Sequence, residues 1–148
     1  MQLSRADEGI ILEMHRGVLE ATLKRLRMFV LRSKVTLQEI AAPAVDEQAF
    51  RRQNILDGVP VVYPATSDHF VPQMVNLDQL GGINFKKGCY TGQEIVARLH
   101  YLGKLQRRMF QLTADIAPPA PGAQIYLGEE AQAVGEVVDA PADGNCSV

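Results

Sequence analysis

A helix start is indicated in the segment Lys86-Lys87-Gly88-Cys89-Tyr90-Thr91-Gly92-Gln93-Glu94, which continues as Ile95-Val96-Ala97-Arg98-Leu99. Thr91 and Glu94 have the spacing of a capping box. In that motif a threonine oxygen accepts a hydrogen bond from the backbone N–H three residues on, and the glutamate reaches back to the cap. The spacing predicts a helix whose N-cap is Thr91.

The predicted helix has an apolar stripe and a stop signal. Ile95, Leu99 and Leu102 are spaced by four and then three residues, which is the pattern of one helix face. Gly103 follows, where a left-handed C-terminal cap is expected. We therefore expect the helix to bury these three side chains and to end at the glycine.

Cys89 lies two residues before the predicted helix start. Its thiol is expected near the positive end of the helix dipole and near unpaired N–H groups, and two lysines precede it. All three features favour the thiolate, which is the nucleophilic and metal-binding form. Gly88 and Gly92 flank this position, as expected where the backbone turns tightly or lets a ligand approach. The plainer interpretation is a capped helix after a glycine-rich turn, with no special thiol.

Residues 87–94 resemble the K-G-C-Y-x-G-Q-E signature of the YgfZ-type folate-binding proteins, relatives of the aminomethyltransferase T-protein of glycine cleavage. Further segments resemble the blocks of this family in the same order, namely residues 31–35, 54–60, 70–74 with 76–77, and 81–83. The resemblance therefore covers most of the chain.

The resemblance implies an α+β fold in two parts. Residues 1–103 are expected to form part of a folate-binding, aminomethyltransferase-like sheet domain. Residues 104–148 are expected to form part of a small antiparallel β-barrel, in agreement with short strand patterns separated by turn residues. In that family the chain begins earlier, continues further, and has additional sheet and helix between the blocks at 31–35 and 54–60. We therefore expect a fragment or a shortened chain.

The resemblance also implies a ligand, a reactive group and partners. The ligand is tetrahydrofolate, and Cys89 is the essential reactive residue. The expected partners, besides folate, are iron-sulfur proteins and tRNA-modifying enzymes. The positions expected to contact the cofactor within the signature are Lys87, Gly88, Tyr90, Gly92, Gln93 and Glu94.

Charge adds two arginines to this set. Residues 86–108 carry six basic side chains against the single acid Glu94, although the whole chain has a net charge of −2. Such a segment suggests an anion, and guanidinium groups hold carboxylates in a bidentate fork. Arg98, Arg107 and Arg108 are therefore predicted to matter more for anion binding than the lysines, and Arg98 and Arg108 are assigned to the cofactor. Arg98 also lies four residues after Glu94, so a local salt bridge is the alternative. A phosphate, a local RNA contact or a solvated basic edge remain open, while a pI near 5.9 argues against a dedicated nucleic-acid binder.

Composition is that of a globular protein. The 148 residues are 47% hydrophobic and 22% charged, and no apolar run approaches the roughly 20 residues that span a bilayer. The opening residues do not form a signal peptide, so we predict a cytoplasmic protein without membrane contact. Two cysteines and three scattered histidines do not suggest a disulfide framework or a metal site.

Periodicity predicts the remaining elements. Strands are expected at 9–14 and 35–40 on either side of an amphipathic helix at 18–30, followed by a short helix at 46–52. Later strands are expected at 61–63, 104–112, 124–127 and 133–138. We interpret His69 as a partly buried structural histidine, because no carboxylate pattern orients it.

Three functional hypotheses follow. The first is a folate-binding accessory protein that supports iron-sulfur enzymes and tRNA modification. The second is a tetrahydrofolate-dependent aminomethyltransferase-like enzyme. In those transferases an acidic residue two positions before a glycine holds the pterin, whereas here that position is Leu56, with Asp57 one step on. The accessory protein is therefore preferred. The third hypothesis is a fragment with no activity of its own.

Overall fold

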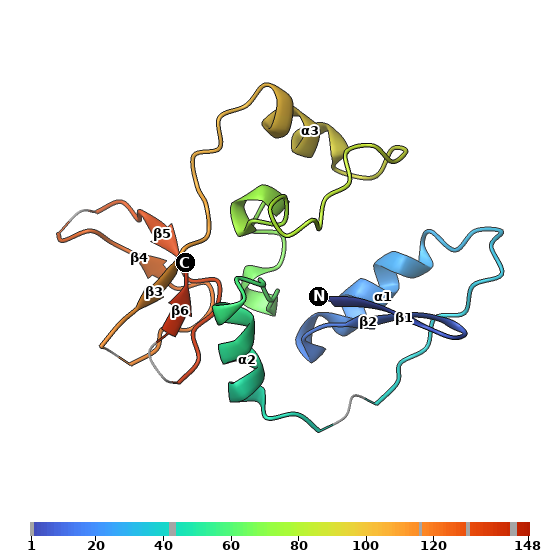
Figure 1. Ribbon diagram of the computed structural model, residues 1–148, viewed down its shortest axis with the longest axis horizontal. Coiled ribbons are helices and arrows are strands. Elements are labelled where there is room, and N and C mark those ends of the chain that lie inside the picture. The colour runs from blue at the N-terminus through green and yellow to red at the C-terminus, as the bar shows by residue number, and fades with distance from the viewer. Residues whose placement is uncertain (1, 42–43, 116, 130, 143–144) are drawn as a thin grey trace.

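The computed structural model describes residues 2–41, 44–115, 117–129, 131–142 and 145–148. It is a mixed arrangement of helices and small antiparallel sheets. Figure 1 shows a hairpin with α1 on one side, short strands on the other, and α3 apart from both. The helix α2 and a series of turns lie between these parts.

The chain begins with an antiparallel hairpin of β1 (Gln2–Ala6) and β2 (Gly9–Glu13). The strand expected at 9–14 is confirmed, whereas β1 was not foreseen. A short 3₁₀ helix, Arg16–Val18, leads into α1 (Leu19–Arg27). The expected amphipathic helix is thus confirmed over most of its length. Its leucines are half-buried, and Lys24 and Arg25 are exposed.

The strand expected at 35–40 is wrong, because this segment has no strand conformation in the described residues. Val35 and Ile40 are 53% and 58% exposed. A strand is stable only when a neighbour pairs with its N–H and C=O groups, and alternation of apolar residues does not supply that neighbour. The expected strand–helix–strand unit is therefore replaced by a hairpin and a helix.

The helix expected at 46–52 extends further, as α2 (Glu47–Leu56). Asp46 is its N-cap, and its carboxylate accepts from the N–H groups of Gln48 and Ala49 at 3.0 and 3.2 Å. The last turn buries Asn54 and Ile55 at 4% and 1% exposure. This end of the helix anchors it to the rest of the chain.

The strand expected at 61–63 is also wrong. The Tyr63 N–H donates to the Thr66 hydroxyl at 3.1 Å and so begins a 3₁₀ turn, η2 (Pro64–Thr66). Pro60 and Pro64 have no N–H to offer a sheet. A second 3₁₀ turn, η3 (Pro72–Val75), follows and ends at Asn76, whose φ is +58°.

Two separate two-stranded sheets form the C-terminal part. In one, β3 (Gln111–Thr113) pairs with β6 (Asn145–Ser147), and in the other β4 (Gln124–Ile125) pairs with β5 (Gly135–Glu136). The described strands have two or three residues and pair only two by two, so they do not close the expected barrel. The strand expected at 104–112 is present only at its end, and those expected at 124–127 and 133–138 are shorter than predicted.

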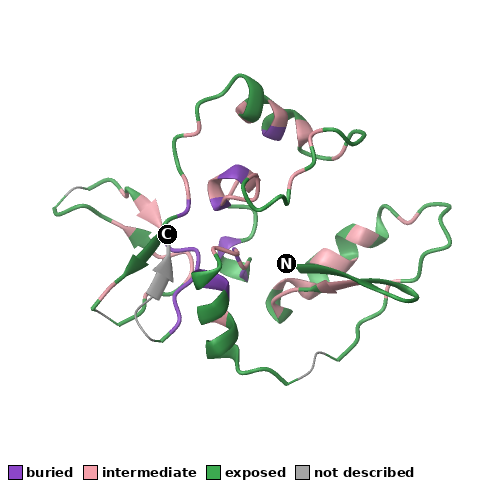
Figure 2. Cartoon of the chain, in the orientation of Figure 1, coloured by how far each residue is buried: buried purple, intermediate pink, exposed green. Residues whose placement is uncertain are grey.

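Two small hydrophobic clusters hold the centre together. Val75, Met109 and Val138 pack with Phe70 and Leu77. The neighbouring Val137 and Ala140 pack with a second set, Ala123, Ile125 and Val148. Because Val137 and Val138 serve different clusters, the segment that carries them joins the two. Figure 2 shows buried residues along this segment, at the end of α2 and in the central turns.

Contacts cross the predicted boundary after residue 103. The Met109 N–H donates to the Met74 carbonyl at 2.7 Å, and the Arg108 guanidinium donates to Asn76 and Asp78 at 3.0 and 2.8 Å. In the described part of the chain, no helix is long and apolar enough to cross a membrane.

Candidate functional site: the loop before α3

The helix predicted from the signature forms as α3 (Gln93–Tyr101), but its start differs from the prediction. The N-cap is Gly92, with φ +85°, and no side chain caps this end. The capping box of Thr91 and Glu94 is therefore wrong. Instead, the Gln93 side-chain oxygen accepts from the Tyr90 N–H, and the Gln93 N–H donates to the Tyr90 carbonyl, both at 3.1 Å. Gly92, in the left-handed conformation, reverses the chain direction, and the two hydrogen bonds between Gln93 and Tyr90 stabilise this turn.

The apolar stripe predicted for α3 is also wrong. Ile95 and Leu102 are 59% and 87% exposed, and Leu99 is half-buried, whereas Val96 is 5% exposed. The buried side follows the contact with η3, because the buried Gln73 amide donates to the Val96 carbonyl at 2.6 Å. Ile95 on this helix and Leu102 just after it therefore face outward.

Gly103 is required because a side chain at this position would collide with the helix, and not because it forms a left-handed cap. Its φ is not in the left-handed region, but a Cβ here would lie 2.9 Å from the Leu99 Cα. The N–H groups of Leu102 and Gly103 both donate to the Arg98 carbonyl, at 2.9 and 2.8 Å. The helix thus ends in a tight turn that only glycine can follow closely.

The loop that carries the thiol is held at both ends. At one end the Asn84 side chain accepts from the N–H groups of Lys86 and Lys87, at 2.8 and 3.1 Å. At the other end the Gln93 side chain holds the Tyr90 N–H. Between them lies Cys89, which is exposed and not in a disulfide.

Tyr90 adds two features to this loop. The Lys87 ammonium lies over its ring, 4.8 Å from the centroid, which is a cation–π contact. Its hydroxyl is buried, and no hydrogen-bond partner lies within the described residues. Since buried hydroxyls are normally paired, this group is a suitable partner for an incoming polar ligand.

The two predicted arginines lie in different surroundings. Arg98 is exposed, and within the described chain it makes no ion pair with Glu94, so the salt bridge considered as the alternative is not formed. Arg108 instead forms a fork with the Asp78 carboxylate, at 3.1 and 2.8 Å, and donates to Asn76 at 3.0 Å. This hydrogen bonding lowers the pKa of Asp78. A ligand carboxylate at Arg108 would have to displace Asp78.

The structure thus brings most of the predicted site residues together in one loop and helix start. Lys87, Gly88, Cys89, Tyr90, Gly92, Gln93 and Glu94 are contiguous, and Arg98 is one turn further along α3. Arg108 belongs to another contact, with the segment after η3.

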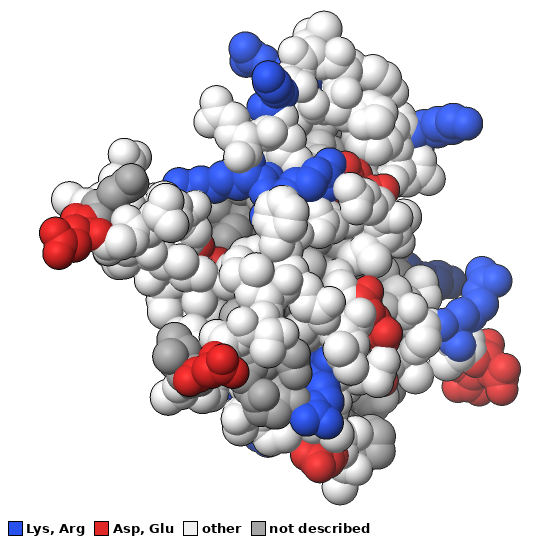
Figure 3. Space-filling model, turned by 60° about the vertical axis from the view of Figure 1, so that its left-hand side comes forward, with Lys and Arg blue, Asp and Glu red and all other residues white. Residues whose placement is uncertain are grey.

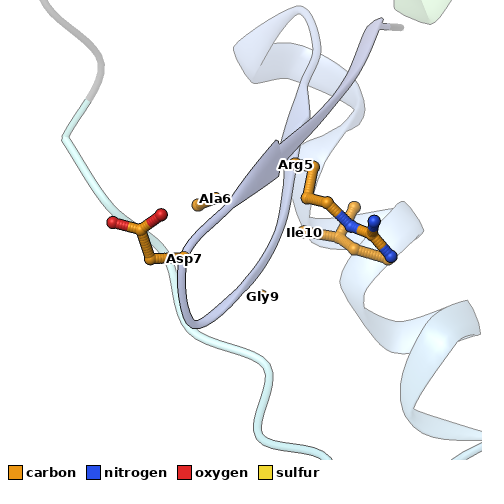
Figure 4. A pocket seen from close by; sticks show the side chains of 5 residues that line it. All are labelled: Arg5, Ala6, Asp7, Gly9 and Ile10. Atoms are coloured by element: carbon orange, nitrogen blue, oxygen red, sulfur yellow. The ribbon is translucent and has the colours of Figure 1, made fainter.

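Two surface hollows in the described chain lie away from this loop. One hollow lies at the tip of the β1–β2 hairpin and is lined by Arg5, Ala6, Asp7, Gly9 and Ile10. Figure 4 shows the Arg5 and Asp7 side chains pointing to opposite sides, so they do not converge on a ligand. A smaller hollow of about 200 Å³ lies between α1 and the turns and includes Thr22 and Val62. Neither contains a predicted site residue.

Sequence reasoning missed a buried polar cluster around Asp139. This carboxylate is 2% exposed and accepts from the Arg51 guanidinium at 2.5 and 2.9 Å and from the Tyr63 hydroxyl at 2.8 Å. Burial, and then the hydrogen bond to Asp139, raise the pKa of Tyr63 well above its usual value, so the phenol stays protonated. The cluster joins α2, η2 and the C-terminal segment, and it has no local sequence signal.

The interpretation of His69 also needs correction. Its side chain is 47% exposed, and its Nδ1 lies 2.6 Å from the Glu136 carboxylate on β5. The histidine therefore has a carboxylate partner, 67 residues downstream. No spacing rule connects two such positions.

No family model matches the chain. The chain is nevertheless similar to individual proteins. It is 34% identical over 131 residues to the tRNA-modifying protein YgfZ of Colwellia psychrerythraea, covering 82% of this chain and 40% of that protein. It is 41% identical over 101 residues to the protein of that name from Vibrio vulnificus strain CMCP6, covering 66% and 31%. It is 43% identical over 98 residues to the one from Escherichia coli strain SMS-3-5, covering 64% and 30%.

These relatives carry a single protein name, so the chain is similar over much of its length to one class of protein. That class is the YgfZ family, to which the chain belongs. The chain spans 30% to 40% of the length of these relatives.

Proposed function

We propose that this chain provides the reactive loop of a folate-binding accessory protein that supports iron-sulfur enzymes and tRNA modification. The observation that carries the proposal is the exposed Cys89 thiol on a loop fastened by Asn84 and Gln93. A thiol held before a helix N-terminus and beside lysines is favoured as a nucleophile. The relatives are named for tRNA modification, which supports the wider role.

The residues of the loop fit a folate in three ways. The buried Tyr90 hydroxyl has no partner in the described chain and can bond a polar ring edge. Gly88 leaves the backbone open, since nothing in the described residues lies within 4 Å of where its Cβ would be. Arg98 is exposed and can hold a tail carboxylate. When bound, tetrahydrofolate would supply a carrier for one-carbon units.

The other residues would act by positioning. The Gln93 amide oxygen accepts from the Tyr90 N–H, so it fixes the backbone that carries the Tyr90 ring. The Lys87 ammonium lies over the Tyr90 ring, which places a positive charge in the loop that carries Cys89. Glu94 lies in the first turn of α3, where a carboxylate stabilises the helix start.

A folate titration tests the ligand. Tetrahydrofolate with one glutamate and with several glutamates is titrated against the chain and against Arg98→Ala. We expect Arg98→Ala to weaken the polyglutamate form more than the monoglutamate form, and added salt to narrow that difference. The exposed Arg25→Ala on α1 is the matched control. Absence of binding by the parent chain, or equal binding by Arg98→Ala, would contradict the folate assignment.

A cellular assay tests the role of the thiol. The chain and its Cys89→Ser variant are expressed in cells that lack their own YgfZ, and iron-sulfur-dependent tRNA modification is measured by mass spectrometry. We expect the parent chain to restore modification and Cys89→Ser to fail, while Cys146→Ser behaves as the parent. Restoration by Cys89→Ser would show that the thiol is not required.

A further inference from the structure

An aromatic cluster lies at the far end of α3 from the thiol. The ring of Phe85 stacks on His100, with centroids 3.9 Å apart and planes at 18°. Tyr101 meets both edge-on, 6.2 Å from Phe85 and 4.7 Å from His100. Although it belongs to this cluster, Tyr101 is 67% exposed. A braced and largely exposed phenol is a surface on which another planar group can stack.

Basic residues flank this cluster in the sequence. In the described part of the chain, no ion pair engages Lys86, Arg98, Lys104 or Arg107, which flank the aromatic residues in sequence. Arg108 is the exception in this segment, because Asp78 binds it. Figure 3 shows blue side chains with little red among them in the upper part of the molecule, the region of α3. The surface around Tyr101 is therefore suited to an anion.

We infer that Tyr101, braced by the Phe85–His100 pair, is a base-stacking site for single-stranded RNA, whose phosphates contact the surrounding lysines and arginines. Exposed aromatic rings beside unpaired cations are the combination by which proteins bind unpaired bases without reading their sequence. A duplex would not suit this site, because its bases are stacked inside. The inference rests on the proposed role in tRNA modification and adds a direct contact with the nucleic acid.

The positive charge of the segment 86–108 favours RNA over a protein as the partner of this cluster. Leu102 is 87% exposed next to the cluster, and such a residue also suits a protein surface. However, the segment 86–108 has six basic residues and one acid, which favours a polyanion. A protein partner would have to be strongly acidic, and competition with poly-glutamate separates this case from RNA binding.

The experiment measures the fluorescence anisotropy of a labelled, short single-stranded oligoadenylate with the chain, without folate. Tyr101→Ala should weaken binding by about 5- to 150-fold, the range expected when one base no longer stacks. Tyr101→Phe should bind as the parent, because stacking needs the ring and not the hydroxyl. Tyr126→Ala is the matched control, since Tyr126 is 53% exposed and lies beyond β4.

Salt dependence tests the binding of phosphates. Lys104→Gln should reduce the slope of log binding constant against log salt by about 0.7, the value for one fewer neutralised phosphate on a single strand. Equal binding by Tyr101→Ala and the parent, an equal loss in Tyr126→Ala, or tighter binding of the matching duplex would overturn the inference. The inference would also be overturned if poly-glutamate displaced the oligonucleotide as well as unlabelled RNA does. That result would indicate that the surface binds any polyanion, or an acidic protein, and not RNA in particular. If the chain binds RNA but does not bind folate, the folate assignment is rejected and the proposed stacking site is retained.

Discussion

The side-chain oxygen of Gln93 accepts a hydrogen bond from the backbone N–H of Tyr90, and the Gln93 N–H donates back to the Tyr90 carbonyl, both at 3.1 Å. This reciprocal pair closes the loop that presents Cys89. It also identifies which side chain stabilises the start of α3.

Substitution of Gln93 should therefore destabilise the chain more than substitution of Thr91. We expect Gln93→Ala to lower the free energy of unfolding by about 0.5–1.5 kcal/mol, the usual contribution of one hydrogen bond. Thr91→Ala should stay within about 0.5 kcal/mol of the parent, because Thr91 is exposed and does not cap the helix. Urea denaturation of both variants measures this, and a larger loss in Thr91→Ala would restore the original capping assignment.

The two glycines of the signature should respond differently to alanine. Gly92 has φ +85°, a conformation that costs an L-residue about 1–2 kcal/mol. Gly88 is not in that region and has open space around it in the described chain. We expect Gly92→Ala to lower the denaturation midpoint and Gly88→Ala to leave it unchanged or raise it slightly. Equal effects would show that the turn at Gly92 is not held in this conformation.

Removal of the Asp139 carboxylate should be strongly destabilising. Asp139→Ala leaves the Arg51 guanidinium, which is only 16% exposed, without its partner, and the expected loss is about 3–5 kcal/mol. Tyr63→Phe removes one hydrogen bond to a charged group and should cost about 1.5–3 kcal/mol. Denaturation curves give both values. If Asp139→Ala is no worse than Tyr63→Phe, then the ion pair contributes little.

Acid should weaken the contact between Asp78 and Arg108. Hydrogen bonding to Arg108 lowers the pKa of Asp78 in the folded chain below its unfolded value of about 3.9. The stability that this pair supplies is therefore present above about pH 4 and is lost as the pH falls through the lowered folded pKa. Asp78→Asn should flatten the acid side of the stability–pH curve. Asp115→Asn, an exposed carboxylate without an ion pair in the described chain, should not.

Cys89 should react with iodoacetamide in the folded chain without denaturant, because its side chain is exposed. Lys87→Gln should slow the reaction with iodoacetate, an anion, more than the reaction with iodoacetamide, since the Lys87 ammonium two residues away attracts negative charge to this loop. Lys104→Gln, beyond the other end of α3, is the control and should leave the rate unchanged. The measurement is the alkylation rate in a Cys146→Ser background, and equal rates in the two lysine variants would remove the proposed influence of Lys87.

Local patterns in the sequence predicted local structure well. The leucines of α1 repeat at helical spacing and are half-buried as expected. Asp46 begins α2 with a side-chain cap, although the helix runs four residues beyond the predicted end, to Leu56. The signature loop could be located from the sequence because its residues are consecutive.

Structure that depends on distant partners could not be predicted. The segment 35–40 alternates like a strand but pairs with nothing in the described chain, and β1 was missed because its partner β2 gives it its form. The site was affected in the same way. Arg108 is occupied by Asp78, 30 residues earlier, and no spacing pattern gives such a pair.

The bond between Arg51 and Asp139 joins residues 88 positions apart, and the whole signature loop lies between them. During synthesis Arg51 emerges long before Asp139, so this ion pair can form only after α3 and the loop before it have left the ribosome. Closing so long a span is entropically unfavourable and slow compared with forming a turn. The hydrogen bonds of Asn84 and Gln93 that hold the thiol-bearing loop join residues two or three positions apart, so they need no part of the C-terminal segment. A chain truncated before residue 139 would keep the residues that make these loop contacts and would lose the ion pair between Arg51 and Asp139.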